Sequence, residues 1–215
     1  LDVVVLRLLE AERTNARGGA VTYLAQVDSK VALPALQPWD GVLTEHPLRQ
    51  PWARVNGPQD DVAWARGVIE CRGGTLTAAP EQIRSWNLSS LWRLQTTLGV
   101  TWLKVVPPFF AHEGAVLTAL SSAPVPRLLG HDGARVLLAE VPGEDLYTAP
   151  LRERLTMVDV LVNLQQQWIG RSEELIGLGA ADWRAPALTR AIGTLLARRA
   201  PELPADERER LLAFN

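Results

Sequence analysis

The sequence of 215 residues has few of the side chains that form disulfides and metal sites. Its single cysteine, Cys71, excludes an intrachain disulfide and a site built from several thiolates. The three histidines, His46, His112 and His131, lack the spacing of a zinc site. No run approaches the roughly eighteen apolar residues of a membrane span, and the opening stretch has no signal-peptide pattern. We therefore expect a protein of the reducing cytoplasm with no membrane partner.

A strong net charge is also absent. The formal net charge of −2 gives no general electrostatic reason to bind nucleic acid, so we expect no such partner. Hydrophobic residues make up 47% of the chain, which is enough for a substantial core. Lysine is scarce, with two lysines against twenty arginines. Each lysine is therefore a candidate for a specific role.

The first part of the chain predicts a hairpin followed by a proline-rich segment. Apolar and β-branched residues fill 2–12 and 20–28, on either side of a glycine-containing turn. Residues 31–59 are rich in proline, which opposes regular structure. We expect this segment to lie over a neighbouring surface, held there by Trp39 and Trp52.

The rest of the chain changes from strand patterns to helix patterns. Helical spacing of apolar residues covers 60–72. Short runs with a period of two then predict an antiparallel sheet between residues 85 and 141, interrupted by one helix over 110–122. Helical spacing returns at residue 155 and continues to Asn215.

This order of strands first and helices later is typical of an α+β chain. We predict an N-terminal extension over residues 1–84, a sheet lobe over 85–141 and the first helices of a helical lobe over 142–215. Because the last predicted helix runs to Asn215, we expect the native chain to be longer.

Lys104 lies within the apolar run WLKVVPPFFAHEGAVLTAL, residues 102–120. In a strand, Trp102 and Lys104 share one face, and Leu103 lies on the other. A lysine in this position either extends its amine along the apolar surface to water or holds it against an anion. The strand pattern by itself favours the first alternative.

Glu113 changes this interpretation because it joins the apolar stripe of the predicted helix, with Val116 and Leu120. Taken alone, a first-turn glutamate is explained by the helix dipole, which is worth about 0.3 to 1 kcal/mol. Together with Lys104 it predicts an inward-facing ion pair between a strand and the next helix. Loss of one partner of a buried pair costs about 3 to 5 kcal/mol. The proline pair at 107–108 fits the turn between the two elements.

On the strings WLKVVPPFFAHEG and EVPGEDL, the chain resembles the aminoglycoside phosphotransferase and choline kinase-like family, over about residues 85–215. The resemblance implies a protein-kinase-like fold and ATP-dependent phosphotransfer to a hydroxyl of a small-molecule substrate. It also implies ATP and Mg²⁺ as cofactors, with the metal ligands beyond this chain. In kinases of this kind, a strand lysine contacts the α and β phosphates and a helix glutamate orients it, which assigns Lys104 and Glu113. The backbone at Glu140 and Val141 is implied to bind the adenine edge.

The sequence departs from the family pattern at the phosphate-covering loop. Ser89 and Ser90 occupy the segment where kinases usually have a glycine-rich loop. They either donate hydroxyl and backbone N–H groups to phosphates or simply begin a strand. Beyond the hinge, Glu144 and Asp145 either meet the ribose or a cationic substrate, or form a polar loop.

The His-Gly-Asp catalytic string of the family is absent. The stretch at 131–133 is predicted as a turn between strands, and Asp182, which precedes the expected catalytic loop, as structural. We therefore expect these 215 residues to catalyse nothing by themselves. The alternative is a non-catalytic nucleotide-binding or interaction module. A hydrolase or nucleotide-sugar enzyme has no G-x-S-x-G or G-x-G-x-x-G string in its favour.

Overall fold

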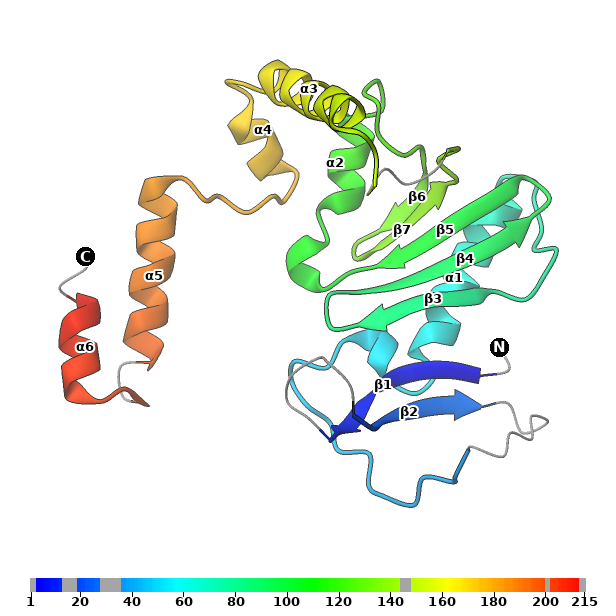
Figure 1. Ribbon diagram of the computed structural model, residues 1–215, viewed down its shortest axis with the longest axis horizontal. Coiled ribbons are helices and arrows are strands. Elements are labelled where there is room, and N and C mark those ends of the chain that lie inside the picture. The colour runs from blue at the N-terminus through cyan, green and yellow to red at the C-terminus, as the bar shows by residue number, and fades with distance from the viewer. Residues whose placement is uncertain (1–2, 13–18, 28–35, 144–147, 200–201, 213–215) are drawn as a thin grey trace.

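A computed structural model describes residues 3–12, 19–27, 36–143, 148–199 and 202–212. These residues form two antiparallel sheets and six α-helices, which confirms the predicted α+β class (Figure 1).

The N-terminal hairpin is confirmed. Strands β1 (Val3–Ala11) and β2 (Val21–Val27) pair antiparallel and form a sheet of their own. The described part of the proline-rich segment that follows contains the short 3₁₀ turn η1 (Pro51–Ala53), whose Trp52 is fully buried. Trp39 differs from expectation, since half of its surface is exposed and it does not anchor the segment in the core.

The larger sheet has five strands in the spatial order β3-β4-β5-β7-β6, with every neighbouring pair antiparallel (Figure 1). The strands are β3 (Glu81–Trp86), β4 (Ser89–Thr96), β5 (Gly99–Val105), β6 (Leu128–Asp132) and β7 (Arg135–Ala139). Between β5 and β6 the chain forms the 3₁₀ turn η2 (Pro108–Phe110) and helix α2 (Glu113–Ala119). The predicted helix over 110–122 is therefore present but shorter.

Strand β3 was not predicted as a strand. It is an edge strand without a buried residue, so its sequence lacks the alternation that reveals a half-buried strand. Beyond this edge lies the hairpin. The side-chain amide of Gln82 in β3 bonds to the hairpin in the way that the backbone of a neighbouring strand would. Gln82 accepts from Val5 N–H and donates to Val5 C=O, both at 2.9 Å. The sheet therefore begins at Glu81, within the segment predicted as the extension.

The main core lies between the large sheet, helix α1 (Gly57–Cys71) and the hairpin. Alternate residues of β4, β5 and β7 face this core, and the helix and the hairpin close it. Its members include Trp92, Leu94, Leu103, Leu137, Val62, Ala65, Ile69, Val4, Leu6 and Leu24. The division at residue 85 stays a prediction, but the buried residues on its two sides form one cluster.

Helix α1 is fastened to the sheet by a charge pair and a close contact. The buried Asp61 accepts a hydrogen bond from Arg135 Nε of β7 at 2.8 Å. The guanidinium of Arg135 also lies 5.9 Å from the ring centre of Trp64 on the same helix. At Gly130 of β6, a Cβ atom would lie 2.8 Å from Val68 Cγ1, so this glycine permits the close approach.

Four helices follow the sheet: α3 (Leu151–Gln167), α4 (Ser172–Gly177), α5 (Ala185–Arg199) and α6 (Ala205–Leu212). None of the residues of α3, α4 and α5 is buried. Figure 1 shows α5 and α6 well away from both sheets. Helix α4 lies within the stretch predicted as helical from residue 155, although it was not predicted as a separate helix. Among the described residues, no helix combines the length and apolar character needed to cross a membrane.

Candidate functional site

Lys104 lies on β5, which is hydrogen-bonded to a strand on each side. Its cross-strand partners are Leu91 of β4 and Val136 of β7, so its backbone is held from both edges. Leu103 and Val105 face the main core, and Lys104 points to the opposite face of the sheet. The predicted alternation along this strand is therefore confirmed.

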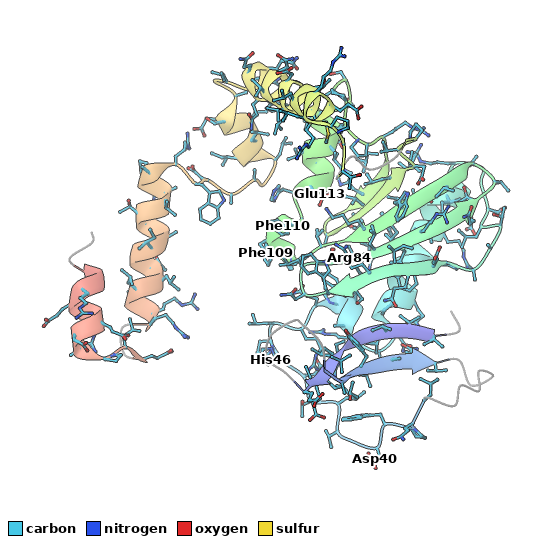
Figure 2. The ribbon with its side chains drawn as sticks, in the orientation of Figure 1. Asp40, His46, Arg84, Phe109, Phe110 and Glu113 are labelled. Carbon is cyan, nitrogen blue, oxygen red and sulfur yellow. The ribbon has the colours of Figure 1, made fainter. Side chains whose placement is uncertain are left out.

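The chain leaves β5 through the proline pair. Pro107 is extended and Pro108 opens η2, where Phe110 N–H donates to Pro107 C=O at 2.9 Å. The rings of Phe109 and Phe110 meet edge to face, with centroids 4.6 Å apart, and both stay largely exposed. Figure 2 shows Glu113 just beyond this turn, at the start of α2.

Lys104 and Glu113 form a two-pronged ion pair. Lys104 Nζ lies 2.7 Å from Glu113 Oε1 and 2.8 Å from Oε2. The predicted contact between strand and helix is thus confirmed. The expected burial is only partial, since the two side chains keep 34% and 28% of their surface exposed. Solvent screens such a pair, so its contribution to stability is nearer to about 1 kcal/mol than to the cost quoted for buried pairs.

Gly114 positions the glutamate, although it was not among the residues predicted from the sequence. A methyl group at Gly114 would lie 2.8 Å from His131 Nδ1 of β6 and closer still to the Cβ of that residue. Helix α2 can approach β6 this closely only because position 114 has no side chain. The available signal was a glycine inside a predicted helix, which costs about 0.5 to 1 kcal/mol relative to alanine and so needs a packing reason.

The structure separates the two serines predicted at the phosphate loop. The register pairs Leu91 with Lys104, so Ser89, two residues earlier, lies on the lysine's face, and Ser90 lies on the core face. Ser90 is fully buried, and its hydroxyl accepts a hydrogen bond from Trp92 Nε1 at 2.9 Å. The Ser90 hydroxyl therefore cannot act on the lysine's side of the sheet.

Ser89 also has a partner within the protein. Its hydroxyl oxygen accepts a hydrogen bond from Trp86 Nε1 at 2.7 Å, across the turn between β3 and β4. The hydroxyl hydrogen of Ser89 is not used in that bond and can be donated to a ligand.

The predicted hinge at Glu140 and Val141 directly follows β7. Glu140 N–H donates to Val100 C=O at 3.1 Å, so this donor is already used, and the Glu140 carboxylate accepts from the indole N–H of Trp102. Val141 is largely exposed. Contacts with an adenine would thus fall to the Glu140 carbonyl and the Val141 backbone. The residues Glu144 and Asp145 lie outside those that the structure describes.

Asp182 is engaged by its neighbour Arg184, as expected for a structural residue. Its Oδ1 accepts from the backbone N–H and from Nε of Arg184 at 3.1 and 2.8 Å, and its Oδ2 accepts from Nη2 at 2.8 Å. The hydrogen bonds from the Arg184 side chain, followed by the one from its backbone, lower the pKa of Asp182 to about 2. The turn predicted at 131–133 is only partly confirmed, since His131 and Asp132 are the last residues of β6 and only Gly133 belongs to the turn before β7.

Metal ligands are not gathered anywhere in the described part of the chain. No group of three or more His, Cys, Asp or Glu side chains is placed there to hold a metal ion. The site therefore offers one amine and one carboxylate in contact, both reachable by solvent, at the junction of a rigid strand and a short helix. Such an amine can bind the oxygen atoms of an anion. No family model, curated protein or solved structure matches this chain.

Proposed function

We propose that this chain is the nucleotide-binding part of an ATP-dependent small-molecule phosphotransferase with a protein-kinase-like fold. The observation that carries the proposal is the contact of Lys104 Nζ with both carboxylate oxygens of Glu113. An ion pair between a lysine on the third strand and a glutamate on the following helix is the arrangement that kinases need to hold ATP. In this chain, β5 is the third strand of the larger sheet along the sequence, and α2 is the next helix.

Partial exposure of the pair supports a role in binding an anion. A purely structural pair gains little from leaving a third of each side chain in solvent, whereas a phosphate-binding lysine must be reachable. Glu113 holds the amine in place before the nucleotide arrives, which lowers the entropy lost on binding. Ser89 is the further phosphate contact that we propose, through its hydroxyl, because it lies on the same face as Lys104.

The adenine is proposed to contact the backbone at Glu140 and Val141, and the protein to act in the cytoplasm without nucleic acid. Magnesium would accompany the nucleotide, but no described residue of this chain is assigned as its ligand. The alternative is a nucleotide-binding or interaction module without transfer chemistry. It is favoured by one observation: the residues assigned so far would hold nucleotide, and none would hold an acceptor hydroxyl.

The substitution Lys104→Ala is expected to weaken nucleotide binding. With the non-hydrolysable analogue AMP-PNP and Mg²⁺, calorimetric titration of the wild type is expected to show saturable binding. The variant should bind at least about tenfold more weakly, because it loses a charge-assisted hydrogen bond worth about 1.5 to 3 kcal/mol. Glu113→Gln should weaken binding less, because the amine remains but is held less firmly.

Arg66→Gln is the matched control, since it removes one positive charge from the exposed face of α1, outside the proposed site. Its affinity should equal that of the wild type. Equal affinity of Lys104→Ala and the wild type would refute the phosphate contact. Absence of ADP release from ATP is expected under both alternatives, because these 215 residues lack the His-Gly-Asp string, whereas measurable release would favour the enzyme.

A further inference from the structure

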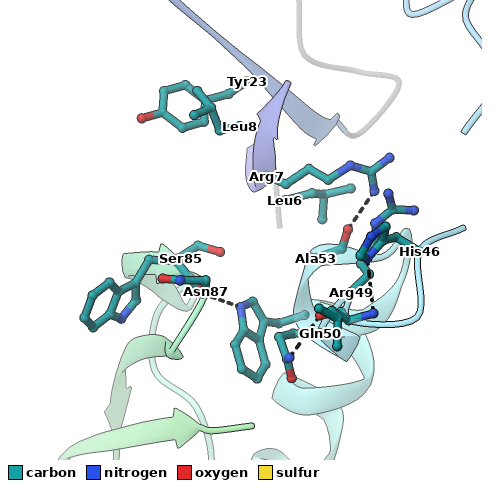
Figure 3. A pocket seen from close by; sticks show the side chains of 13 residues that line it. Leu6, Arg7, Leu8, Tyr23, His46, Arg49, Gln50, Ala53, Ser85 and Asn87 are labelled. Carbon is teal, nitrogen blue, oxygen red and sulfur yellow. Dashed lines mark hydrogen bonds between the residues drawn. The ribbon is translucent and has the colours of Figure 1, made fainter. Parts of the chain in front are cut away.

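A cavity of about 510 Å³ lies between the hairpin β1–β2, the segment leading into η1, and the turn after β3 (Figure 3). Its lining residues come from the hairpin, from the segment up to and including η1, and from the end of β3 with the residue that follows it, and none belongs to β5 or α2. It is therefore separate from the Lys104–Glu113 site. The volume is within the range of about 300 to 1,000 Å³ that is usual for small-molecule sites.

The walls of this cavity are rich in apolar and aromatic side chains. Leu6 and Trp52 form a buried base, and the indole N–H of Trp52 donates to Trp86 C=O at 2.9 Å, which fixes that ring. Tyr23 and Trp86 also line the cavity and remain 53% and 47% exposed. Exposed rings beside a buried indole offer flat apolar surfaces to a ligand.

Two arginines bring positive charge to the same cavity. Arg7 Nη1 donates to Ala53 C=O at 2.9 Å, and Arg49 Nη1 donates to Thr44 C=O. Figure 3 shows the guanidinium of Arg7 directed toward the segment that carries His46. Burial, followed by repulsion from Arg49, lowers the pKa of Arg7. A guanidinium has five N–H donors, so these bonds leave donors of both arginines for an anion.

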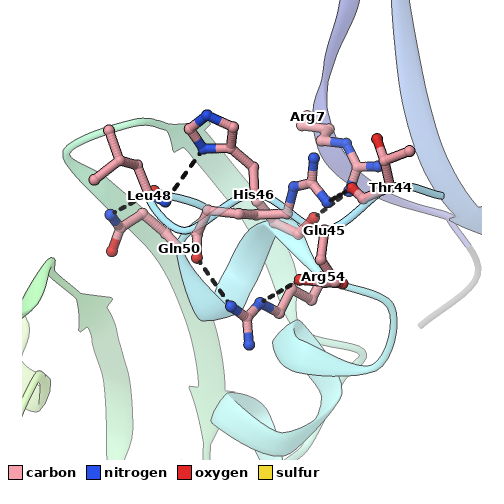
Figure 4. Close-up of polar contacts among 9 residues, drawn as sticks. Arg7, Thr44, Glu45, His46, Leu48, Gln50 and Arg54 are labelled. Atoms are coloured by element: carbon pink, nitrogen blue, oxygen red, sulfur yellow. Dashed lines mark hydrogen bonds and ion pairs between the residues drawn. The ribbon is translucent and has the colours of Figure 1, made fainter.

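His46 and Ser85 are further polar residues that line the cavity. Leu48 N–H donates to His46 Nδ1 at 3.2 Å (Figure 4), so the neutral imidazole carries its proton on Nε2 and is a donor there. The hydroxyl of Ser85 is buried without a hydrogen-bond partner among the described residues. A buried polar group without a partner is costly, and a bound ligand or water can satisfy it.

The nearby carboxylate of Glu45 does not cancel this charge. It attracts the Arg7 guanidinium, which opposes the lowering of the pKa of Arg7. Glu45 also lies 3.6 Å from Arg54 Nε and is not among the residues that line the cavity. Among the described lining residues there is no Asp or Glu, so the cavity itself has positive character.

We propose that this cavity binds a small organic anion with a flat apolar body, such as an aryl phosphate or an aryl carboxylate. Arg7 and Arg49 hold the anionic group, because their guanidinium groups match the paired oxygen atoms of phosphates and carboxylates. The apolar body lies against Trp52, Trp86 and Tyr23. The proposal does not rest on the proposed phosphotransfer, and the cavity shares no lining residue with that site, although Trp86 donates to Ser89.

The test uses three probes with one ring system: 1-naphthyl phosphate, 1-naphthoate and the neutral 1-naphthalenemethanol. Binding is followed in ¹H–¹⁵N spectra through the indole N–H signals of Trp52 and Trp86, with Trp183 of the distant helical segment as internal reference. We expect at least one anionic probe to shift both signals with a dissociation constant below about 1 mM, and the neutral probe to bind at least about tenfold more weakly.

Arg49→Gln and, separately, Arg7→Gln should each weaken the anionic probe at least about tenfold, whereas Arg66→Gln on α1 should leave its affinity unchanged. Arg49 is the safer position, because its side chain bonds to the carbonyl of Thr44 in an exposed loop and the variant should fold normally. Preference for the phosphate or for the naphthoate identifies the anionic group. Absence of saturable binding by both anions, equal affinity of the neutral probe, or unchanged affinity in a folded Arg49→Gln protein would overturn the proposal.

Discussion

At the scale of single residues, burial and a charged partner have opposite effects on the pKa of Asp61. Its carboxylate on α1 is almost completely buried and accepts from Arg135 Nε. Burial raises the pKa of Asp61, and the nearby Arg135 only partly counters that effect. The folded protein thus holds the Asp61 proton more tightly than the unfolded chain does. The resulting stabilisation is fully present below the unfolded pKa, about 3.9, and is lost as the pH rises through the raised value.

Asp61→Asn is expected to remove this pH dependence, because an amide does not ionise. The free energy of unfolding in urea should be measured for both proteins from pH 4 to pH 7. Relative to the variant, the wild type should become steadily less stable as the pH rises. Glu70→Gln, on the exposed side of the same helix, should show no such trend. A wild type that gains stability over the variant toward pH 7 would show that Arg135 outweighs burial.

At the scale of elements, the position of α2 depends on the missing side chain at Gly114. Gly114→Ala forces the helix away from His131, because the added Cβ would overlap the side chain on β6. We expect a loss of about 1 to 3 kcal/mol in the free energy of unfolding, as for other overpacked sites. The displaced helix should also separate Glu113 from Lys104 and weaken AMP-PNP binding.

Gly67→Ala is the matched control for that variant. Gly67 lies inside α1, and a Cβ added there would meet no atom within 4 Å. The same substitution should therefore stabilise the protein by about 0.5 to 1 kcal/mol through helix propensity. If both alanine variants gained stability in urea unfolding, the close contact between α2 and β6 would not exist in solution.

At the scale of the whole molecule, buried structure is concentrated in the first 140 residues or so. The core joins the hairpin, α1 and the large sheet, whereas α3, α4 and α5 contain no buried residue. Of the apolar residues with helical spacing in this stretch, Val158 and Leu161 are exposed and Leu164 and Trp168 are half-buried. Helices of this length gain most of their stability from packing, so these helices should open easily.

Amide hydrogen exchange followed by mass spectrometry tests this expectation. Peptides from β4, β5 and α1 should exchange slowly, and peptides from α3 and α5 should exchange much faster at the same pH. The sheet peptides serve as the internal control for global unfolding. Protection of α3 equal to that of β5 would mean that the helix has a packing partner.

Local sequence patterns were sufficient to predict much of the secondary structure of this molecule. The hairpin, the first helix, four strands of the sheet and the helices of the second half follow from periodicities that each segment carries within itself. The pairing of Lys104 with Glu113 was also predictable, since only a short turn separates strand from helix, and both residues interrupt an apolar pattern.

Other features were decided by contacts between distant segments. The edge strand β3 exists because β4 pairs with it and because Val5 of the hairpin bonds to its Gln82 side chain, whereas its own sequence has no buried face. The strand register alone turned Ser90 into the core and Ser89 toward the lysine. Likewise, the cavity forms only when the hairpin carrying Arg7 and the loop carrying Arg49 meet at the same edge of the sheet. Periodicity reports which residues prefer burial, but it does not report which surfaces meet, because that depends on the packing of the whole chain.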